Sequence, residues 1–242
     1  MGCHVTDGPT SRGAHVVPKW EQEALETLRT RIRKFVRPLR ELVDRDANEG
    51  DTRVLVTDML CEALGYDKYE DLTTEYAVRG EFADYGVRID KQLVAFVEVK
   101  RAAQNLKAAH LRQVETYAVK EGIEWIILTN GQVWRTYHVE AATGAPVETH
   151  LVLDVDLLDE STVGDKAGQL FYLHKSAMKR DRIAELWRQK AATAPAALVG
   201  VLLSEAVLDA ARKEVRKRSG YNPDLQSLAN TIRGEVVRAE LL

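Results

Sequence analysis

The chain has 242 residues, of which 45% are hydrophobic and 29% are charged. That composition supports one large domain, or one domain with a smaller appendage, and excludes wholesale disorder. The formal net charge of -3 excludes a strongly basic nucleic-acid coat, although local basic stretches can still contact phosphates. The two cysteines are too few for a disulfide framework, and no apolar run approaches the length of a membrane span. We therefore expect a cytoplasmic protein that does not enter a membrane.

The first part of the chain predicts a tail and two helices. Residues 1–18 are expected to form a flexible N-terminal tail. Apolar residues spaced by three and four predict a helix over residues 20–46. Asn48 is a good N-cap for a second helix, which should end at Gly65. Glu49 then lies in the first turn of that helix.

The middle of the chain alternates strands and one helix, and the end is helical. We expect strands over residues 72–78, 82–89, 93–100, 125–129, 133–139 and 151–155. Asn130-Gly131 predicts a hairpin turn, because both residues tolerate positive φ. Helices are expected over residues 106–121, 178–189, 196–218 and 223–242. The prediction is an α/β domain over residues 19–160, followed by a helical C-terminal segment over residues 176–242.

The strand over residues 93–100 ends in two charged residues. Alternation places Glu98 and Lys100 on the same face as Val94 and Phe96. The opposite face is also apolar, so the strand belongs in the middle of a sheet that is covered on both sides. A carboxylate and an ammonium group at the end of such a strand are costly to desolvate unless they have partners.

The preceding strand brings a second acid, Asp84, towards the same place. Two carboxylates at close range would repel by ~4 kcal/mol in a partly polar setting. A divalent cation relieves that repulsion, and hard oxygen ligands suit magnesium or manganese. The alternative is that Glu98 and Lys100 form a structural ion pair and that Asp84 is a surface acid. An acidic-x-Lys tripeptide alone is a weak signal.

The wider context resembles the PD-(D/E)xK nuclease superfamily. More narrowly, residues 48–139 are similar to the N-terminal nuclease domain of type I restriction enzyme R subunits and of their stand-alone relatives. One departure is Ala83, which replaces the proline in the name of the superfamily at a position that binds no metal. The resemblance is carried by six ordered blocks, which are Asn48-Glu49 with Thr52-Arg53, Leu64-Gly65-Tyr66, Ala83-Asp84-Tyr85, Phe96 to Lys100, Gln113 to Tyr117, and Leu128 to Gly131 with Trp134.

The resemblance implies a restriction-endonuclease-like mixed β-sheet core flanked by helices, with Mg²⁺ as cofactor and Mn²⁺ able to substitute. Asp84, Glu98 and the backbone carbonyl of Val99 would hold the metal ion. Glu49 would reach it directly or through water. Lys100 would lie beside the attacking water or the scissile phosphate, where it adds a fixed positive charge.

Other residues are open to two interpretations. Gln113 and Tyr117 lie four apart on one helix face. The resemblance suggests that they line the site or contact the DNA backbone; alternatively, Tyr117 is a core residue and Gln113 is solvated. The basic stretches 29–40 and 212–218 either contact phosphates or form solvated, internally paired helix faces. His138, His150 and His174 show no metal-ligand spacing with each other or with cysteine.

These features favour a metal-dependent endonuclease that hydrolyses phosphodiester bonds, in DNA rather than RNA, within a restriction or phage-defence setting. A phage-encoded origin is equally compatible. One alternative is a catalytically weak or inactive nucleic-acid-binding module of the same fold. The other is an interaction subunit of a larger restriction or defence complex. We expect the C-terminal helices to mediate a homodimer or to bind a partner protein.

Overall fold

A computed structural model describes residues 17–78, 81–141, 144 and 146–241. The predicted tail, residues 1–18, lies outside the described residues except for Val17 and Pro18. The strands are β1 (Leu72–Val78), β2 (Glu81–Ile89), β3 (Gln92–Val99), β4 (Trp125–Thr129), β5 (Val133–Glu140) and β6 (Glu148–Asp156). The helices are α1 (Lys19–Asp44), α2 (Glu49–Asp58), α3 (Ala108–Glu121), α4 (Val163–Leu170), α5 (Lys175–Met178), α6 (Arg182–Ala192), α7 (Pro195–Leu202), α8 (Glu205–Ser219) and α9 (Leu225–Thr231). Shorter turns are the π-helical η1 (Met59–Ala63) and η3 (Ile232–Val236), and the 3-10 helices η2 (Phe171–Leu173) and η4 (Ala239–Leu241).

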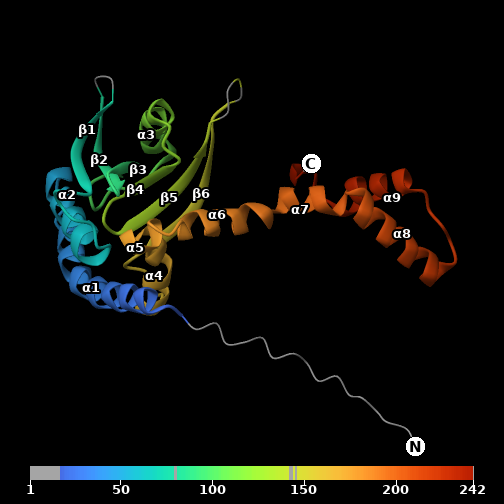
Figure 1. Ribbon diagram of the computed structural model, residues 1–242, viewed down its shortest axis with the longest axis horizontal. Helices are drawn as coiled ribbons and strands as arrows, with labels where there is room; N and C mark the ends of the chain where they lie inside the picture. Colours follow the sequence, from blue (N-terminus) through green and yellow to red (C-terminus); the bar gives the residue numbers. More distant parts are fainter. Residues whose placement is uncertain (1–16, 79–80, 142–143, 145, 242) are drawn as a thin grey trace, which may run out of the picture.

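The strands form a six-stranded sheet in the order β1-β2-β3-β4-β5-β6 (Figure 1). Neighbours are antiparallel except for β3 and β4, which run parallel and are joined by the crossover helix α3. The fold is therefore the mixed α/β arrangement expected from the sequence. Because β3 and β4 are parallel, their carboxyl ends meet at one edge of the sheet. The beginning of the antiparallel strand β2 lies beside that same edge.

Helices cover both faces of the sheet, which explains the apolar character of β3. The larger core lies between the sheet and α1, α2, α4 and α5, and α1 contributes the buried stripe Leu28, Ile32, Phe35 and Leu39. Burial of each of these side chains contributes roughly 1.5–3 kcal/mol. The smaller core lies between α3 and the opposite face of the sheet (Figure 1). A central strand between two apolar layers needs apolar residues on both of its sides.

The predicted alternation of faces along β3 holds for the second half of the strand and fails in the first half. Phe96 packs against α3, whereas Ala95 belongs to the larger core, as expected. The pairing of β2 with β3 shifts register between Val87 and Arg88. Val94 is thereby left as an extra residue and packs against the larger core, not beside Phe96. The prediction for Val94 was wrong because a bulge cannot be recognised from the alternation alone.

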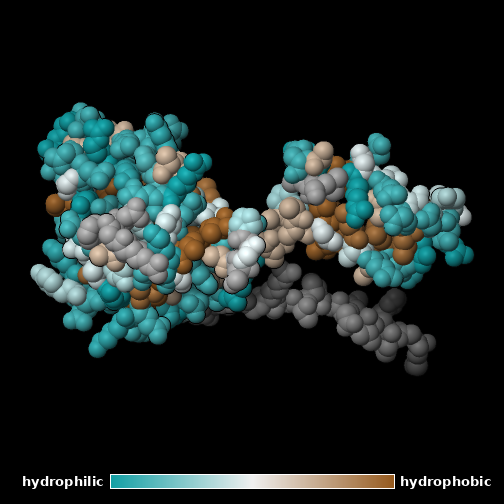
Figure 2. Space-filling view, turned by 90° about the horizontal axis from the view of Figure 1, so that it is seen from above, coloured by the Kyte–Doolittle hydropathy of each residue, from teal (hydrophilic) through white to brown (hydrophobic). Residues whose placement is uncertain are grey.

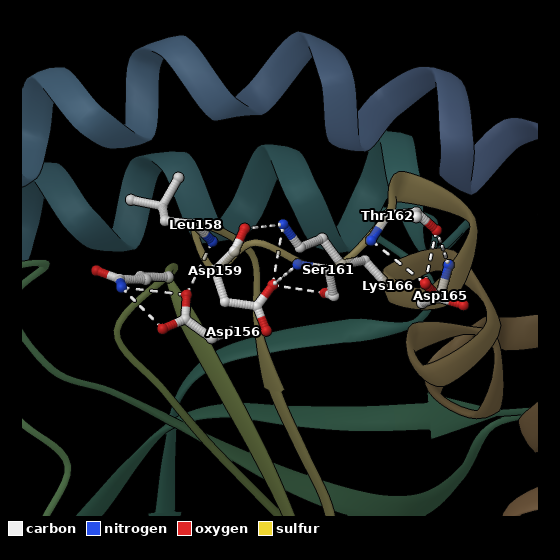
Figure 3. Close-up of polar contacts among 8 residues, drawn as sticks. Asp156, Leu158, Asp159, Ser161, Thr162, Asp165 and Lys166 are labelled. Carbon is white, nitrogen blue, oxygen red and sulfur yellow. Dashed lines mark hydrogen bonds and ion pairs between the residues drawn. The ribbon is translucent and has the colours of Figure 1, made fainter.

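Figure 3 shows the turn that leads from β6 into α4. The Asp156 carboxylate accepts hydrogen bonds from the Gln132 side chain, which ties the turn to the β4–β5 hairpin. Lys166 is buried, and its Nζ donates to the Asp159 carbonyl oxygen at 2.8 Å and lies 3.1 Å from the Asp159 carboxylate. Thr162 caps α4. These contacts fix α4 where it can pack against α1.

The C-terminal helices extend away from the sheet. In Figure 1, α6 leads to a smaller cluster that is formed by α7, α8 and α9. The prediction of a single helix over residues 196–218 is wrong in one respect. Helix α7 ends at Leu202 and α8 begins at Glu205, because the backbone of Ser204 between them is extended. Figure 2 shows apolar surface on this cluster, which includes the exposed residues Leu198, Val201 and Leu202 of α7. In the described part of the chain, every helix is too short or too polar to cross a lipid bilayer.

Candidate active site at the ends of the parallel strands

Glu98 lies near the carboxyl end of β3 and is only 3% exposed. Its Oε1 accepts a hydrogen bond of 2.6 Å from Lys100 Nζ, whereas its Oε2 is buried and has no hydrogen-bond partner. Burial raises the pKa of Glu98, and the charges of Asp84 and Glu49 raise it further, against the lowering effect of Lys100. A buried carboxylate oxygen without a partner is costly. The site therefore presents an acceptor that a cation would satisfy.

Lys100 follows β3 directly, and its side chain is 14% exposed. Burial alone would lower the pKa of Lys100. The hydrogen bond to Glu98, together with the negative charges of Glu98, Glu49 and Asp84, outweighs burial and raises the pKa. Lys100 is therefore a fixed cation at neutral pH. It is suited to electrostatic stabilisation of an anion and unsuited to act as a general base.

Asp84 comes from β2 and is anchored to the end of β3. Its Oδ2 accepts a hydrogen bond of 2.7 Å from the backbone N–H of Val99, and its Oδ1 lies 3.5 Å from Arg53 Nη1. Tyr85 pairs with Val97 across the two antiparallel strands. One step further along, Asp84 therefore lies beside Glu98, in agreement with the effect of its charge on the pKa of Glu98.

The strand pair is distorted at Asp84. Ala83 belongs to the smaller core and Tyr85 to the larger one, so the regular alternation of faces breaks between them. Glu75 of β1 lies opposite this step and has a φ of 50°, which is uncommon for residues with a side chain. The Glu75 carboxylate also lies 3.5 Å from Arg53 Nη2. The distortion directs the Asp84 carboxylate towards the end of β3.

Helix α2 brings Glu49 to the same region. The side chain of Asn48 accepts a hydrogen bond from the Asp51 N–H and so fixes the start of the helix. The buried Thr52 Oγ1 accepts a hydrogen bond of 3.0 Å from the Ala102 N–H, which ties α2 to the segment that follows β3. Glu49 contributes through its charge, which raises the pKa values of Glu98 and Lys100.

Asn130 has a supporting role that the sequence did not predict. It lies in the predicted turn and is buried. Its Oδ1 accepts hydrogen bonds from the N–H groups of Gln132 and Val133, while its Nδ2 donates to the carbonyl oxygens of Ala102, at 3.2 Å, and Gln104, at 3.0 Å. Asn130 thus fixes the loop after Lys100. The sequence offered one signal of this role, which is an amide side chain in a hairpin between apolar strands. That signal does not show which backbone groups the Asn130 side chain bonds.

The two residues expected on α3 lie in different environments. Tyr117 is 1% exposed and packs in the smaller core, while Gln113 is exposed and its Nε2 donates to the Tyr117 hydroxyl at 3.1 Å. Contact of this pair with DNA stays a prediction. His110, in the first turn of α3, has a lowered pKa, because burial and the positive charge of Lys100 both disfavour its protonated form.

The structure brings Asp84, Glu98 and Lys100 into one cluster, and Glu49 lies at its margin. The three carboxylates are not in tight metal-ligand geometry. In the described residues, one set of three possible metal ligands has one ligand atom from each residue within 4.8 Å of the others, and that set is Glu140, Glu148 and His150.

The mixed sheet, its flanking helices and the acidic-x-Lys strand end define a restriction-endonuclease-like fold. Residues 48–150 match the family model described as type I restriction enzyme R protein N terminus. This segment therefore resembles the nuclease-like N-terminal domain of those proteins, and it spans less than half of the chain. No curated protein and no solved structure gave a match.

Proposed function

We propose that this protein is a magnesium-dependent DNA endonuclease of a restriction or phage-defence system. The observation that carries the proposal is the buried Glu98 Oε2, which has no hydrogen-bond partner and lies in a cluster with Asp84 and Lys100. The family match supports a nuclease-like domain of the restriction type. DNA is the proposed substrate because the matched family consists of restriction-enzyme domains.

The donor atoms at this site fit a hard divalent cation. Asp84, Glu98 and the carbonyl oxygen of Val99 would hold Mg²⁺, and Glu49 would reach it directly or through water. A bound Mg²⁺ ion would lower the pKa of a coordinated water and neutralise charge on the phosphate. Lys100 supplies a second positive charge beside the scissile phosphate, and its hydrogen bond to Glu98 holds it in position.

The test uses supercoiled plasmid, linear duplex, single-stranded DNA and RNA, each incubated with the purified protein and Mg²⁺ or Mn²⁺. We expect cleavage of duplex DNA that EDTA abolishes and that Glu98→Gln and Lys100→Met reduce at least a hundredfold. Lys91→Met is the matched control, because Lys91 is an exposed residue in the β2–β3 turn. Cleavage that persists in both site variants would identify a contaminating nuclease.

A binding module of the same fold is the main alternative outcome. In that case the protein would retain DNA in a gel-shift assay and cleave none of the four substrates with either metal ion. The presence of both carboxylates and the lysine in one cluster favours turnover, because binding of a metal ion requires the carboxylates alone, whereas a lysine beside them can stabilise charge on a phosphate.

We also propose that the C-terminal helices mediate a homodimer, because cleavage of both DNA strands usually requires two sites. The proposal is supported by the exposed apolar residues Leu198 and Leu202 on α7, which is otherwise poorly covered. Sedimentation equilibrium should give a dimer for the parent and a monomer for the Leu198→Glu/Leu202→Glu double variant. A monomeric parent would point instead to a different partner protein.

A further inference from the structure

A second group of metal-ligating side chains lies on the β5–β6 ribbon, away from the site at Glu98. His138 of β5 is the cross-strand partner of His150 of β6, and Glu140 is the partner of Glu148. Cross-strand partners and residues two apart on one strand share a face. The two imidazoles and the two carboxylates therefore form a block on one face of the ribbon. Ligand atoms of Glu140, Glu148 and His150 lie within 4.8 Å of one another.

The two glutamates oppose each other directly, and like charges in that arrangement destabilise a strand pair. The nearby groups only partly offset this repulsion. His150 Nε2 lies 3.5 Å from the Glu148 carboxylate, and His138 Nδ1 lies 3.5 Å from Glu140 Oε1. Both distances are longer than those of charge-assisted hydrogen bonds. A divalent cation between the carboxylates would remove the repulsion.

His138 lies beside the three candidate ligands and faces Glu140. Its side chain is 12% exposed, and its Nδ1 is buried and has no hydrogen-bond partner. The imidazole is held in place by Trp125, whose ring centroid is 4.9 Å away, and by Trp187 of α6, also at 4.9 Å. The His150 ring also contacts Trp187, in a tilted arrangement with the ring centroids 4.8 Å apart. Both rings are thus positioned before any ligand binds.

We propose that Glu140, Glu148 and His150 bind a divalent transition-metal ion of the zinc class, and that His138 supports the site from beside Glu140. Imidazole nitrogen with carboxylate oxygen suits Zn²⁺, whereas the all-oxygen set around Glu98 suits Mg²⁺. His138 acts as a positioning residue, since a histidine that faces a ligating carboxylate orients it. The role is structural, because an ion here joins Glu140 of β5 to Glu148 and His150 of β6, and the His150 ring contacts Trp187 of α6. The proposal does not depend on nuclease activity.

The test measures metal binding by the full-length chain carrying Glu98→Gln in excess Mg²⁺. The substitution and the Mg²⁺ together prevent Zn²⁺ from binding at the candidate magnesium site around Glu98. We expect equilibrium dialysis to give one Zn²⁺ per chain, with an affinity reduced at least tenfold by His150→Ala and by Glu148→Gln. Glu121→Gln, at an exposed acid near the end of α3, is the matched control and should bind like the parent. No binding by the parent, or equal binding by the parent and His150→Ala, would overturn the proposal.

Tryptophan fluorescence gives a second readout that reports position. Co²⁺ bound beside His150 should quench Trp187, so saturating Co²⁺ should lower the emission of the parent. Trp187→Phe should lose most of this quenching and keep the same stoichiometry. Glu148→Gln changes an exposed side chain and is compatible with the fold, so it keeps the test decisive if His150→Ala is unstable. Quenching that is unchanged in Trp187→Phe would contradict the assigned position.

Discussion

The backbone N–H of Val99 donates a hydrogen bond of 2.7 Å to Asp84 Oδ2. This contact joins the acid of β2 to the strand end that presents Glu98 and Lys100. Asp84 therefore has two separable roles. Its Oδ2 accepts the hydrogen bond that joins the two strands, and its negative charge contributes to the candidate metal site. The second carboxylate oxygen, Oδ1, is 3.5 Å from Arg53.

Replacing Asp84 should separate these two properties. Asp84→Asn keeps an oxygen that can accept from Val99, so its stability should stay close to that of the parent, while cleavage should fall at least a hundredfold because the charge is lost. Asp84→Ala also leaves the Val99 N–H without its acceptor, which costs about 1–3 kcal/mol. Urea unfolding and initial cleavage rates measure the two effects. Normal cleavage by Asp84→Asn would remove Asp84 from the proposed metal ligands.

Glu98 should lower the stability of the metal-free protein at neutral pH. Burial raises its folded-state pKa above the ordinary value of 4.5. Between those two pKa values the folded protein binds more protons than the unfolded chain, so stability falls as pH rises through that interval and the loss persists above it. Glu98→Gln removes the ionisation. The variant should be more stable than the parent at pH 7.5 by on the order of 1 kcal/mol.

The pH and metal dependence of that difference provide the check. Urea midpoints measured in EDTA should converge for parent and variant as the pH falls well below the ordinary pKa of 4.5, because Glu98 is then protonated in both the folded and the unfolded state. Adding Mg²⁺ should raise the midpoint of the parent and leave that of Glu98→Gln nearly unchanged. If Mg²⁺ stabilises both proteins equally, the ion binds elsewhere.

Lys100→Met should reduce catalysis and spare metal binding. The change keeps the aliphatic part of the side chain and removes the positive charge, so we expect a loss of roughly 10²–10³-fold in cleavage rate at saturating Mg²⁺. It also removes the hydrogen-bond donor to Glu98, so the pKa of Glu98 should rise further. The acidic limb of the pH–rate profile should then move to higher pH in the residual activity. An unchanged profile would contradict the coupling between the two residues.

The strands and the core of the candidate site could be predicted from the sequence because local patterns specify them. A run of residues that is apolar on both faces marked β3, and the alternation of side chains between the two faces placed Glu98 and Lys100 on one face at its end. Helix α4 was missed as a separate helix. It begins at the Thr162 cap, but it is too short to show a clear helical periodicity of apolar residues. The break at Ser204 was missed because neither Leu203 nor Ser204 is a helix-breaking residue.

Contacts between segments distant in sequence could not be predicted in the same way. The hydrogen bond from Asn130 to Ala102 spans 28 positions, and nothing in either local sequence specifies it. The group formed by Glu140, Glu148 and His150 depends on the register of β5 against β6, which shifts between Thr136 and Tyr137. Spacing along one strand contains no information about that register.

Thr52 tests whether the attachment of α2 to the segment after β3 matters for the site. Thr52→Val is nearly isosteric, but it removes the buried acceptor of the Ala102 N–H, which should cost about 1–3 kcal/mol in the free energy of unfolding. Cleavage should also fall, because Glu49 is positioned by the same helix. Thr116→Val is the matched control, since Thr116 is exposed and bonds only within its own helix. Urea unfolding should leave Thr116→Val within about 0.5 kcal/mol of the parent. Equal stability of the two variants would show that the Thr52 contact does not hold α2 in place.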